Sequence, residues 1–142
     1  MSEELLIDTN ILVYAYDSTQ GEKHVRANRI IADVFAGKMK AYITTQILGE
    51  LFITLVKESK NPMPKEMVGE IIGGIVESNN WIKLSANPLT IIYTAKLYRK
   101  DFHFWDCLIA ATALENFVTT IYTENVKDFQ NIPGIKAINP LI

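Results

Sequence analysis

The sequence predicts one α/β domain, with a parallel five-stranded sheet and helices on both of its faces. Two observations predict this three-layer α/β/α arrangement. Five short apolar runs of strand length are separated along the chain by longer helical segments, a pattern typical of parallel sheets covered by helices. The length of 142 residues allows one core of ordinary size, so we expect residues 1–142 to form a single domain.

The first half of the chain is expected to contain two strands and three helices, over residues 5–7, 11–16, 22–35, 41–43 and about 45–58. Asp8-Thr9-Asn10 offers N-cap chemistry for the first helix. Gly37 can end the second helix, because glycine adopts the left-handed conformation found just after many helices. Thr44 or Thr45 can cap the third.

The second half begins at Asn61–Pro64, where each proline disfavours helix in the residue before it. The elements expected after this break cover residues 65–77, 81–84, 89–99, 104–117, 119–122 and 136–138. Gly73-Gly74 weakens the first of these helices. Pro88 suits the first position of the helix at 89–99, where a missing backbone N–H costs little.

Composition limits the classes of protein that need consideration. The hydrophobic fraction of 49% and charged fraction of 21% are close to globular averages and exclude a disordered chain. No apolar run reaches the roughly 18 residues that a membrane span requires, so we expect no membrane association. Met1–Leu5 carries two acids and no base, which is not a secretory signal. The single cysteine, Cys107, forbids an internal disulfide and suits a cytoplasmic protein.

The net charge of -2 gives no support for nucleic-acid binding by overall field. Any argument for a nucleic-acid substrate must therefore come from a specific site. Lys57, Lys60, Lys65 and Lys127 could hold RNA phosphates, although solvated lysines are the simpler interpretation of each.

Asp8 is the first candidate site residue. It directly follows the apolar run Leu5–Ile7 and should lie at the carboxyl end of a strand, where sheets of this class bind ligands. Aspartate is also a favoured N-cap, and capping explains an isolated Asp8 equally well.

Asp106 is a stronger candidate, because it lies within an apolar face. On a helical wheel of residues 102–117 its neighbours are Phe102, Ile109, Ala110, Ala113 and Phe117. A carboxylate in such a stripe is costly unless it is paired, protonated or bound to a cation. Pairing with a lysine or arginine, helped by the positive end of the helix dipole, is the alternative interpretation.

Glu50 lies off the centre of its helix's apolar stripe, and a solvated helix face is the ordinary explanation. Its position about one turn after Thr44-Thr45 nevertheless places it near the same edge of the sheet as Asp8. The segment Tyr122–Phe129 begins where another strand ends, and brings Thr123, Glu124, Asn125 and Asp128 to that edge.

These regions together predict a metal site. Carboxylates brought close together repel one another and raise one another's pKa, so a shared counter-cation is expected. Oxygen ligands without a histidine or cysteine set suit Mg²⁺ or Mn²⁺ better than Zn²⁺. Such ions activate water and offset charge on a phosphoryl transition state, which makes a phosphodiester the natural substrate.

Four segments of the chain form a recognisable pattern in their order and spacing: Leu6–Ile11, Ile43–Glu50, Trp105–Ala113 and Tyr122–Phe129. In these segments the chain resembles PIN domains, and among them the small toxin nucleases of VapC type. The resemblance extends from near residue 4 to about residue 140.

The resemblance implies a strand order of 3-2-1-4-5 and a ribonuclease that depends on Mg²⁺ or Mn²⁺. It places the catalytic and metal-binding acids at Asp8, Glu50 and Asp106. The family's fourth acid usually lies two residues after the threonine of the last segment, where this chain has Asn125. Asp128 or Glu124 could replace it, or Asn125 could hold a water. Supporting polar residues around the acids are expected at Asn10, Thr45, Thr123 and Asn125.

The resemblance also implies partners: an RNA substrate, a small antitoxin protein and a second copy in a homodimer. Two other functions remain open. The chain could be a PIN-fold binding or RNA-processing module with weak catalysis, an alternative that Asn125 favours. It could instead be a phosphatase of haloacid dehalogenase type, but Asn10 stands where that chemistry needs a second aspartate.

Overall fold

The computed structural model describes residues 4–142, and its strands form one parallel sheet in the order β3-β2-β1-β4-β5. This confirms the predicted fold class and the strand order implied by the resemblance. The strands are β1 (Glu4–Ile7), β2 (Lys40–Thr44), β3 (Trp81–Leu84), β4 (Thr120–Tyr122) and β5 (Lys136–Ile138). Of the acidic segment Met1–Leu5, residues 1–3 lie outside the described residues.

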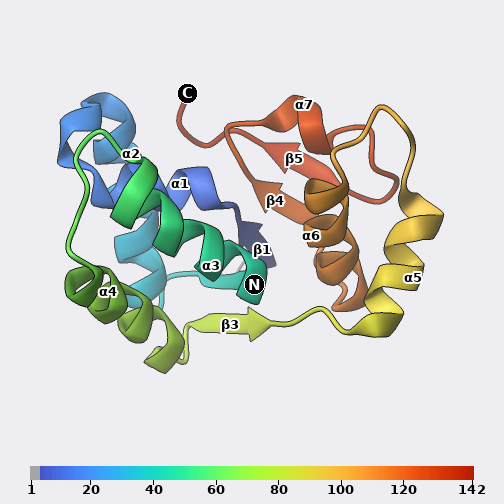
Figure 1. Ribbon diagram of the computed structural model, residues 1–142, viewed down its shortest axis with the longest axis horizontal. Coiled ribbons are helices and arrows are strands. Elements are labelled where there is room, and N and C mark those ends of the chain that lie inside the picture. The colour runs from blue at the N-terminus through green and yellow to red at the C-terminus, as the bar shows by residue number, and fades with distance from the viewer. Residues whose placement is uncertain (1–3) are drawn as a thin grey trace.

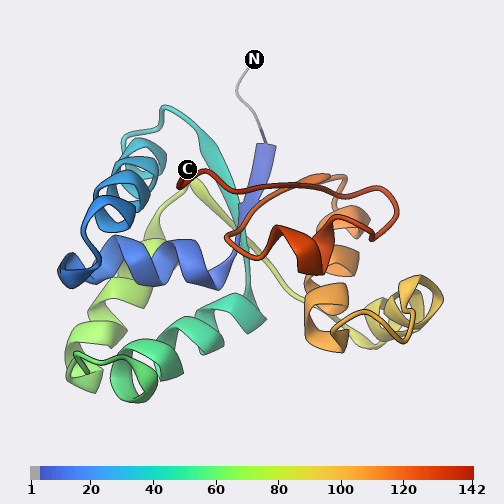
Figure 2. The ribbon, with the colours of Figure 1, turned by 90° about the horizontal axis from the view of Figure 1, so that it is seen from above.

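Four helices and two short helical segments connect β1, β2 and β3. They are α1 (Thr9–Tyr16), the 3₁₀ turn η1 (Ser18–Gln20), α2 (Glu22–Phe35), α3 (Thr45–Ile53), the π-helical segment η2 (Thr54–Glu58) and α4 (Lys65–Glu77). The remaining helices are α5 (Pro88–Leu97), α6 (Phe104–Glu115) and the short α7 (Val126–Phe129). Figures 1 and 2 show α1 to α4 on one side of the sheet, with α5 and α6 on the other. No helix of residues 4–142 is both long and apolar enough to cross a membrane.

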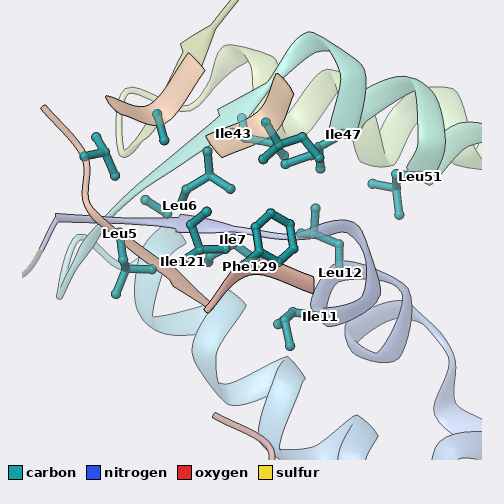
Figure 3. Close-up of a cluster of buried hydrophobic side chains, with 14 of the residues drawn as sticks. Leu5, Leu6, Ile7, Ile11, Leu12, Ile43, Ile47, Leu51, Ile121 and Phe129 are labelled. Carbon is teal, nitrogen blue, oxygen red and sulfur yellow. The ribbon is translucent and has the colours of Figure 1, made fainter. Parts of the chain in front are cut away.

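The central strand β1 fixes the position of Asp8. Leu5, Leu6 and Ile7 are fully buried, and β1 is hydrogen-bonded to β2 on one side and β4 on the other. Figure 3 shows these side chains among apolar residues from α1, β2, α3, β4 and α7. Hydrogen bonding to β4 continues one residue beyond the end of β1, because the backbone N–H of Asp8 donates to the carbonyl oxygen of Tyr122 at 3.0 Å. Asp8 therefore leaves the sheet at a rigid point.

The expected boundaries agree with the structure to within two residues, but some local details differ. α6 was expected to reach Phe117 but ends at Glu115, and Phe117 has a left-handed φ of 62° and is 89% exposed. Placing Phe117 on the apolar face of the helix was therefore wrong. The third helix changes at Thr54 from α to π geometry before it ends at Glu58. The sequence reading did not anticipate η1 or α7, since a helical run of three or four residues is too short to show a periodicity.

Candidate active site

A pocket of about 430 Å³ opens beyond the carboxyl end of β1. Its acidic lining residues come from three different parts of the chain: Asp8 and Asp17 flank α1, Glu50 is in α3, and Asp106 is in α6. The pocket also includes Lys60, in the segment between η2 and α4. This pocket thus opens at the edge of the sheet to which the sheet-end rule directs attention in the sequence.

Asp8 is almost completely buried, with 5% of its surface exposed, and both of its carboxylate oxygens accept hydrogen bonds. Oδ1 accepts from the backbone N–H of Thr9 at 2.8 Å. Oδ2 accepts from the hydroxyl of Thr123 at 2.8 Å and from Nδ2 of Asn10 at 3.3 Å. Burial raises the pKa of Asp8, and the hydrogen bonds from Thr123 and Thr9 oppose that rise. Asp8 is therefore the N-cap of α1 and a pocket carboxylate at once, so the two interpretations of its role are compatible.

Thr123 and Asn10 hold Asp8 as part of a small network. The Thr123 hydroxyl is fully buried and also accepts from Nδ2 of Asn10 at 3.3 Å and from the backbone N–H of Asn125 at 3.0 Å. The amide oxygen of Asn10 accepts from the backbone N–H of Glu124 at 3.0 Å. The loop after β4 is thus bound to the start of α1. Asn10, which stands where a dehalogenase-type phosphatase needs an aspartate, serves here as a hydrogen-bond partner.

Asp106 lies in the first turn of α6 and lines the same pocket. Within residues 4–142 its carboxylate has no hydrogen bond and no lysine or arginine within ion-pair distance. Burial and the nearby charges of Asp8, Asp128 and Glu50 raise the pKa of Asp106 to about 6, against a smaller opposite effect from His103. The alternative interpretation, in which Asp106 forms an ion pair with a lysine or arginine, was therefore wrong for the described part of the chain.

Glu50 is half-buried in α3, and its Oε1 accepts a hydrogen bond from the hydroxyl of Thr9 at 3.1 Å. One turn earlier on the same helix, Nε2 of Gln46 donates to the carbonyl oxygen of Trp105 at 3.3 Å. This bond joins the first turns of α3 and α6, the two helices that bring Glu50 and Asp106 to the pocket. No pattern in the sequence marks Thr9 and Gln46 as supporting residues, because each of these hydrogen bonds depends on a partner more than 40 positions away.

The three candidates for the fourth acid differ in what they contact. Glu124 accepts hydrogen bonds from Lys23 at 2.6 Å and from Tyr14 at 2.7 Å; burial raises its pKa, but these two partners bring it below the usual range. Asp128 has no ion pair within residues 4–142, and its charge raises the pKa of both Asp8 and Asp106. Asn125 itself lines the pocket. Neither Glu124 nor Asp128 lines the acidic pocket, and of the two only Glu124 has an ion pair within residues 4–142.

Thr45 was expected among the polar residues that support the acids. Its hydroxyl instead contacts the hydroxyl of Ser85 at 2.8 Å and the carbonyl oxygen of Leu84 at 3.5 Å, and Thr45 does not line the pocket. The preceding Thr44 caps α3 by accepting from the backbone N–H of Ile47. The two threonines at this helix start thus have different hydrogen-bond partners, and neither lines the pocket.

The donor set and its charge fit a divalent cation, but the side chains are not drawn together at ligand spacing. Asp8, Glu50 and Asp106 offer only oxygen atoms, and the charges of Asp8 and Glu50 contribute to the raised pKa of Asp106, as expected for carboxylates that line one pocket. Within residues 4–142, no group of three His, Cys, Asp or Glu side chains is close enough to form a ready-made metal site. Binding of an ion would therefore require side-chain rotation, which the unpaired carboxylate of Asp106 permits.

Comparison with known proteins gives a fold. No family model matches the sequence, and no curated protein is significantly similar to it. The structure, however, is similar to VapBC2 from Rickettsia felis, solved with a promoter DNA fragment, with a TM-score of 0.64 at 22% identity over 96% of this chain and 98% of that one. The chain has the fold of VapC-type PIN domains.

Two further structures with this PIN fold cover nearly the same length. VapC20 from Mycobacterium tuberculosis, a toxin that cleaves the sarcin-ricin loop, has a TM-score of 0.65 at 16% identity over 86% of this chain and 90% of that one. A toxin-antitoxin complex from Klebsiella pneumoniae has a TM-score of 0.62 at 21% identity over 96% and 97%. At these identities the likeness establishes the architecture, while function depends on the site.

Proposed function

We propose that this chain is a metal-dependent endoribonuclease that hydrolyses phosphodiester bonds in RNA, and that it is the toxin of a toxin–antitoxin pair. One observation carries the proposal. Asp8, Glu50 and Asp106 come from distant parts of the chain and line one pocket, and none has a lysine or arginine partner within residues 4–142. The similar fold of VapC20, described as cleaving the sarcin-ricin loop, supports RNA as the substrate class.

In this proposal Asp8, Glu50 and Asp106 hold Mg²⁺ or Mn²⁺, with Asp128 near them in place of the fourth acid that Asn125 lacks. A bound ion of this kind lowers the pKa of water and offsets charge on the phosphoryl group. The chain's own residues set the geometry. Thr123 and the start of α1 fix the direction of the Asp8 carboxylate, whereas the Asp106 carboxylate can turn without breaking a hydrogen bond.

The decisive experiment compares RNA cleavage by the wild type with Asp8→Asn and Asp106→Asn in Mn²⁺ or Mg²⁺. We expect each substitution to lower the cleavage rate at least about a hundredfold, because each removes a charged ligand while keeping the side-chain shape. Asp101→Asn is the matched control, since Asp101 is an exposed residue five positions before Asp106, paired with Arg99 at 3.5 Å. Equal cleavage by all four proteins would show that the activity does not come from this pocket.

A binding module with weak catalysis is the second candidate. Asn125 at the place of the fourth acid favours it, together with the lack of a ready-made three-ligand group among residues 4–142. Calorimetric titration with Mn²⁺ separates the two candidates. A nuclease should bind the ion at millimolar concentration or below, and Asp8→Asn should abolish that binding. A titration of the wild type that gives no heat of binding would favour the module.

The proposal extends to protein partners and location: a small antitoxin, a second copy of the chain, and a cytoplasmic setting that suits the free, buried thiol of Cys107. The helices α3 and α4 expose Phe52, Ile53, Met67 and Val76, apolar side chains that a partner could cover. Light scattering of the purified chain tests the homodimer. Co-expression with any small open reading frame beside the gene tests the antitoxin.

A further inference from the structure

Lys60 is the only cationic side chain that lines the acidic pocket within the described residues 4–142. It shares this lining with four carboxylates, those of Asp8, Asp17, Glu50 and Asp106. An RNA chain carries one negative charge per phosphate and is repelled by such a pocket. A divalent ion at the acids would offset part of this repulsion, and a cation on another part of the lining would reduce it further.

The ammonium group of Lys60 is available for such a contact. Lys23 and Lys38 have partners in Glu124 and Asp33, but Lys60 has no acidic partner within 4.0 Å among residues 4–142. Its side chain is exposed at the pocket although four acids line the same space. The charge of Lys60 therefore shares the pocket lining with the acids and forms no ion pair with any of them.

Hydrogen bonds hold the segment that carries Lys60 in place. The backbone N–H of Ser59 donates to the carbonyl oxygen of Thr54 at 2.8 Å and closes η2. On the other side, Nδ2 of Asn61 donates to the hydroxyl of Thr19 at 3.2 Å. That hydroxyl donates to Oδ1 of Asp17 at 2.6 Å. Lys60 thus lies between two attachment points, one at the end of the third helix and one at the turn after α1.

This chain of bonds also assigns a role to Asp17. Its carboxylate accepts from the side chain and backbone N–H of Thr19 and from Gln20, and these hydrogen bonds lower its pKa. Both oxygens are used within the turn. Asp17 therefore anchors the turn that holds the Lys60 segment.

We propose that Lys60 binds a phosphate of the RNA chain beside the scissile bond and so offsets the repulsion between the substrate and the acidic pocket. The inference rests on the proposed ribonuclease function. Lys60 acts on substrate binding, and the chemical step stays with the acids. Lys57, three residues earlier and also exposed, does not line the pocket and serves as the matched control.

The test uses Lys60→Gln, Lys60→Arg and Lys57→Gln in the full chain. Cleavage kinetics on a single-stranded RNA with Mn²⁺ should give a KM about fivefold higher for Lys60→Gln with kcat nearly unchanged, the size expected for an exposed charge contact. Lys60→Arg should restore most of the affinity, and Lys57→Gln should behave as the wild type. Thermal unfolding of the variants should coincide, since the side chain makes no ion pair in the described part of the fold.

A second measurement does not depend on cleavage. The affinity for a short fluorescent single-stranded RNA, measured by anisotropy in an Asp8→Asn background at several salt concentrations, reports the number of phosphates contacted. Lys60→Gln should reduce the slope of log Kd against log salt by about 0.7, the value for one phosphate contact on a single strand. An unchanged slope, or an equal change in Lys57→Gln, would overturn the role of Lys60 even if the wild type cleaves RNA. Failure of the wild type to cleave would remove the ribonuclease proposal, and the slope would still decide whether Lys60 binds phosphate.

Discussion

The two aspartates at the centre of the pocket have opposite surroundings. Asp8 is fixed: it is 5% exposed, it ends the central strand, and both its oxygens accept hydrogen bonds. Asp106 is free: its carboxylate has no hydrogen bond within residues 4–142, and burial beside other acids raises its pKa to about 6. Hydrogen bonds therefore fix the orientation of the Asp8 carboxylate, whereas the Asp106 carboxylate has no hydrogen-bonding or lysine or arginine partner among residues 4–142. In the proposed function, a bound cation would supply the counter-charge that Asp106 lacks among residues 4–142.

The largest expected effect on stability comes from removing the support of Asp8. Thr123→Val keeps the shape of a fully buried side chain but deletes the hydroxyl that donates to Oδ2 at 2.8 Å. We expect a loss of about 2 kcal/mol in the free energy of unfolding, because a buried carboxylate loses a donor. Chemical denaturation measures this loss.

The matched control for that experiment is Thr112→Val, since Thr112 is 3% exposed and its hydroxyl donates to the carbonyl oxygen of Leu108 in its own helix. It should cost less than Thr123→Val and leave metal binding unchanged. Equal losses in both variants would mean that Asp8 does not depend on Thr123.

Asp106→Asn should stabilise the metal-free protein, whereas Thr123→Val should destabilise it. The pKa of Asp106 is about 6 in the folded chain against an ordinary 3.8, so the folded state holds this proton more tightly and loses stability as pH rises from about 4 through 6. The substitution should therefore raise the free energy of unfolding by about 1 kcal/mol at pH 7, after allowance for solvent screening, and by almost nothing at pH 4. Thermal unfolding at the two pH values, with chelator present, checks this. Destabilisation at pH 7 would imply a partner for Asp106 that the described residues do not contain.

The smallest expected effect concerns Glu50. Thr9→Val removes the half-buried hydrogen bond to Oε1 at 3.1 Å and should cost about 0.5 kcal/mol in stability. Because Glu50 would then turn more freely, we expect a metal affinity two- to threefold weaker, measured by Mn²⁺ calorimetry. Thr19→Val, which acts at the Asp17 turn, should leave the affinity for Mn²⁺ unchanged.

The sequence predicted the fold well because its signals are local. Apolar runs locate β1 and β2, the prolines of Asn61–Pro64 mark the break before α4, and Pro88 begins α5 as expected. The errors occur where local signals compete or are absent. Phe117 fits the apolar face of α6, but the helix ends before it and leaves it exposed.

Two of the candidate acids could also be identified from the sequence, because their local sequence context is unusual. Asp8 follows an apolar strand, and Asp106 interrupts an apolar helical face, so each violates a local pattern in a way that indicates a role. Glu50 carried almost no such signal, since a glutamate on a helix flank is ordinary, and in the structure it accepts a hydrogen bond from Thr9, the residue after Asp8. Thr45 comes directly after a strand and was therefore expected among the residues that support the acids. Its hydroxyl contacts that of Ser85 instead.

By itself, the sequence determined the strands, the helices and which carboxylates leave the sheet at its carboxyl edge, because hydrophobic periodicity and chain breaks act over a few residues. Only the tertiary structure decided which of these charges remain uncompensated. Glu124 forms an ion pair with Lys23, which lies in a helix about a hundred positions away. The carboxylate of Asp17 accepts hydrogen bonds within its own turn. Asp106 has no hydrogen bond and no lysine or arginine partner among the described residues. Electrostatic pairing depends on distances of a few ångströms between distant segments, and those distances exist only once the chain is folded.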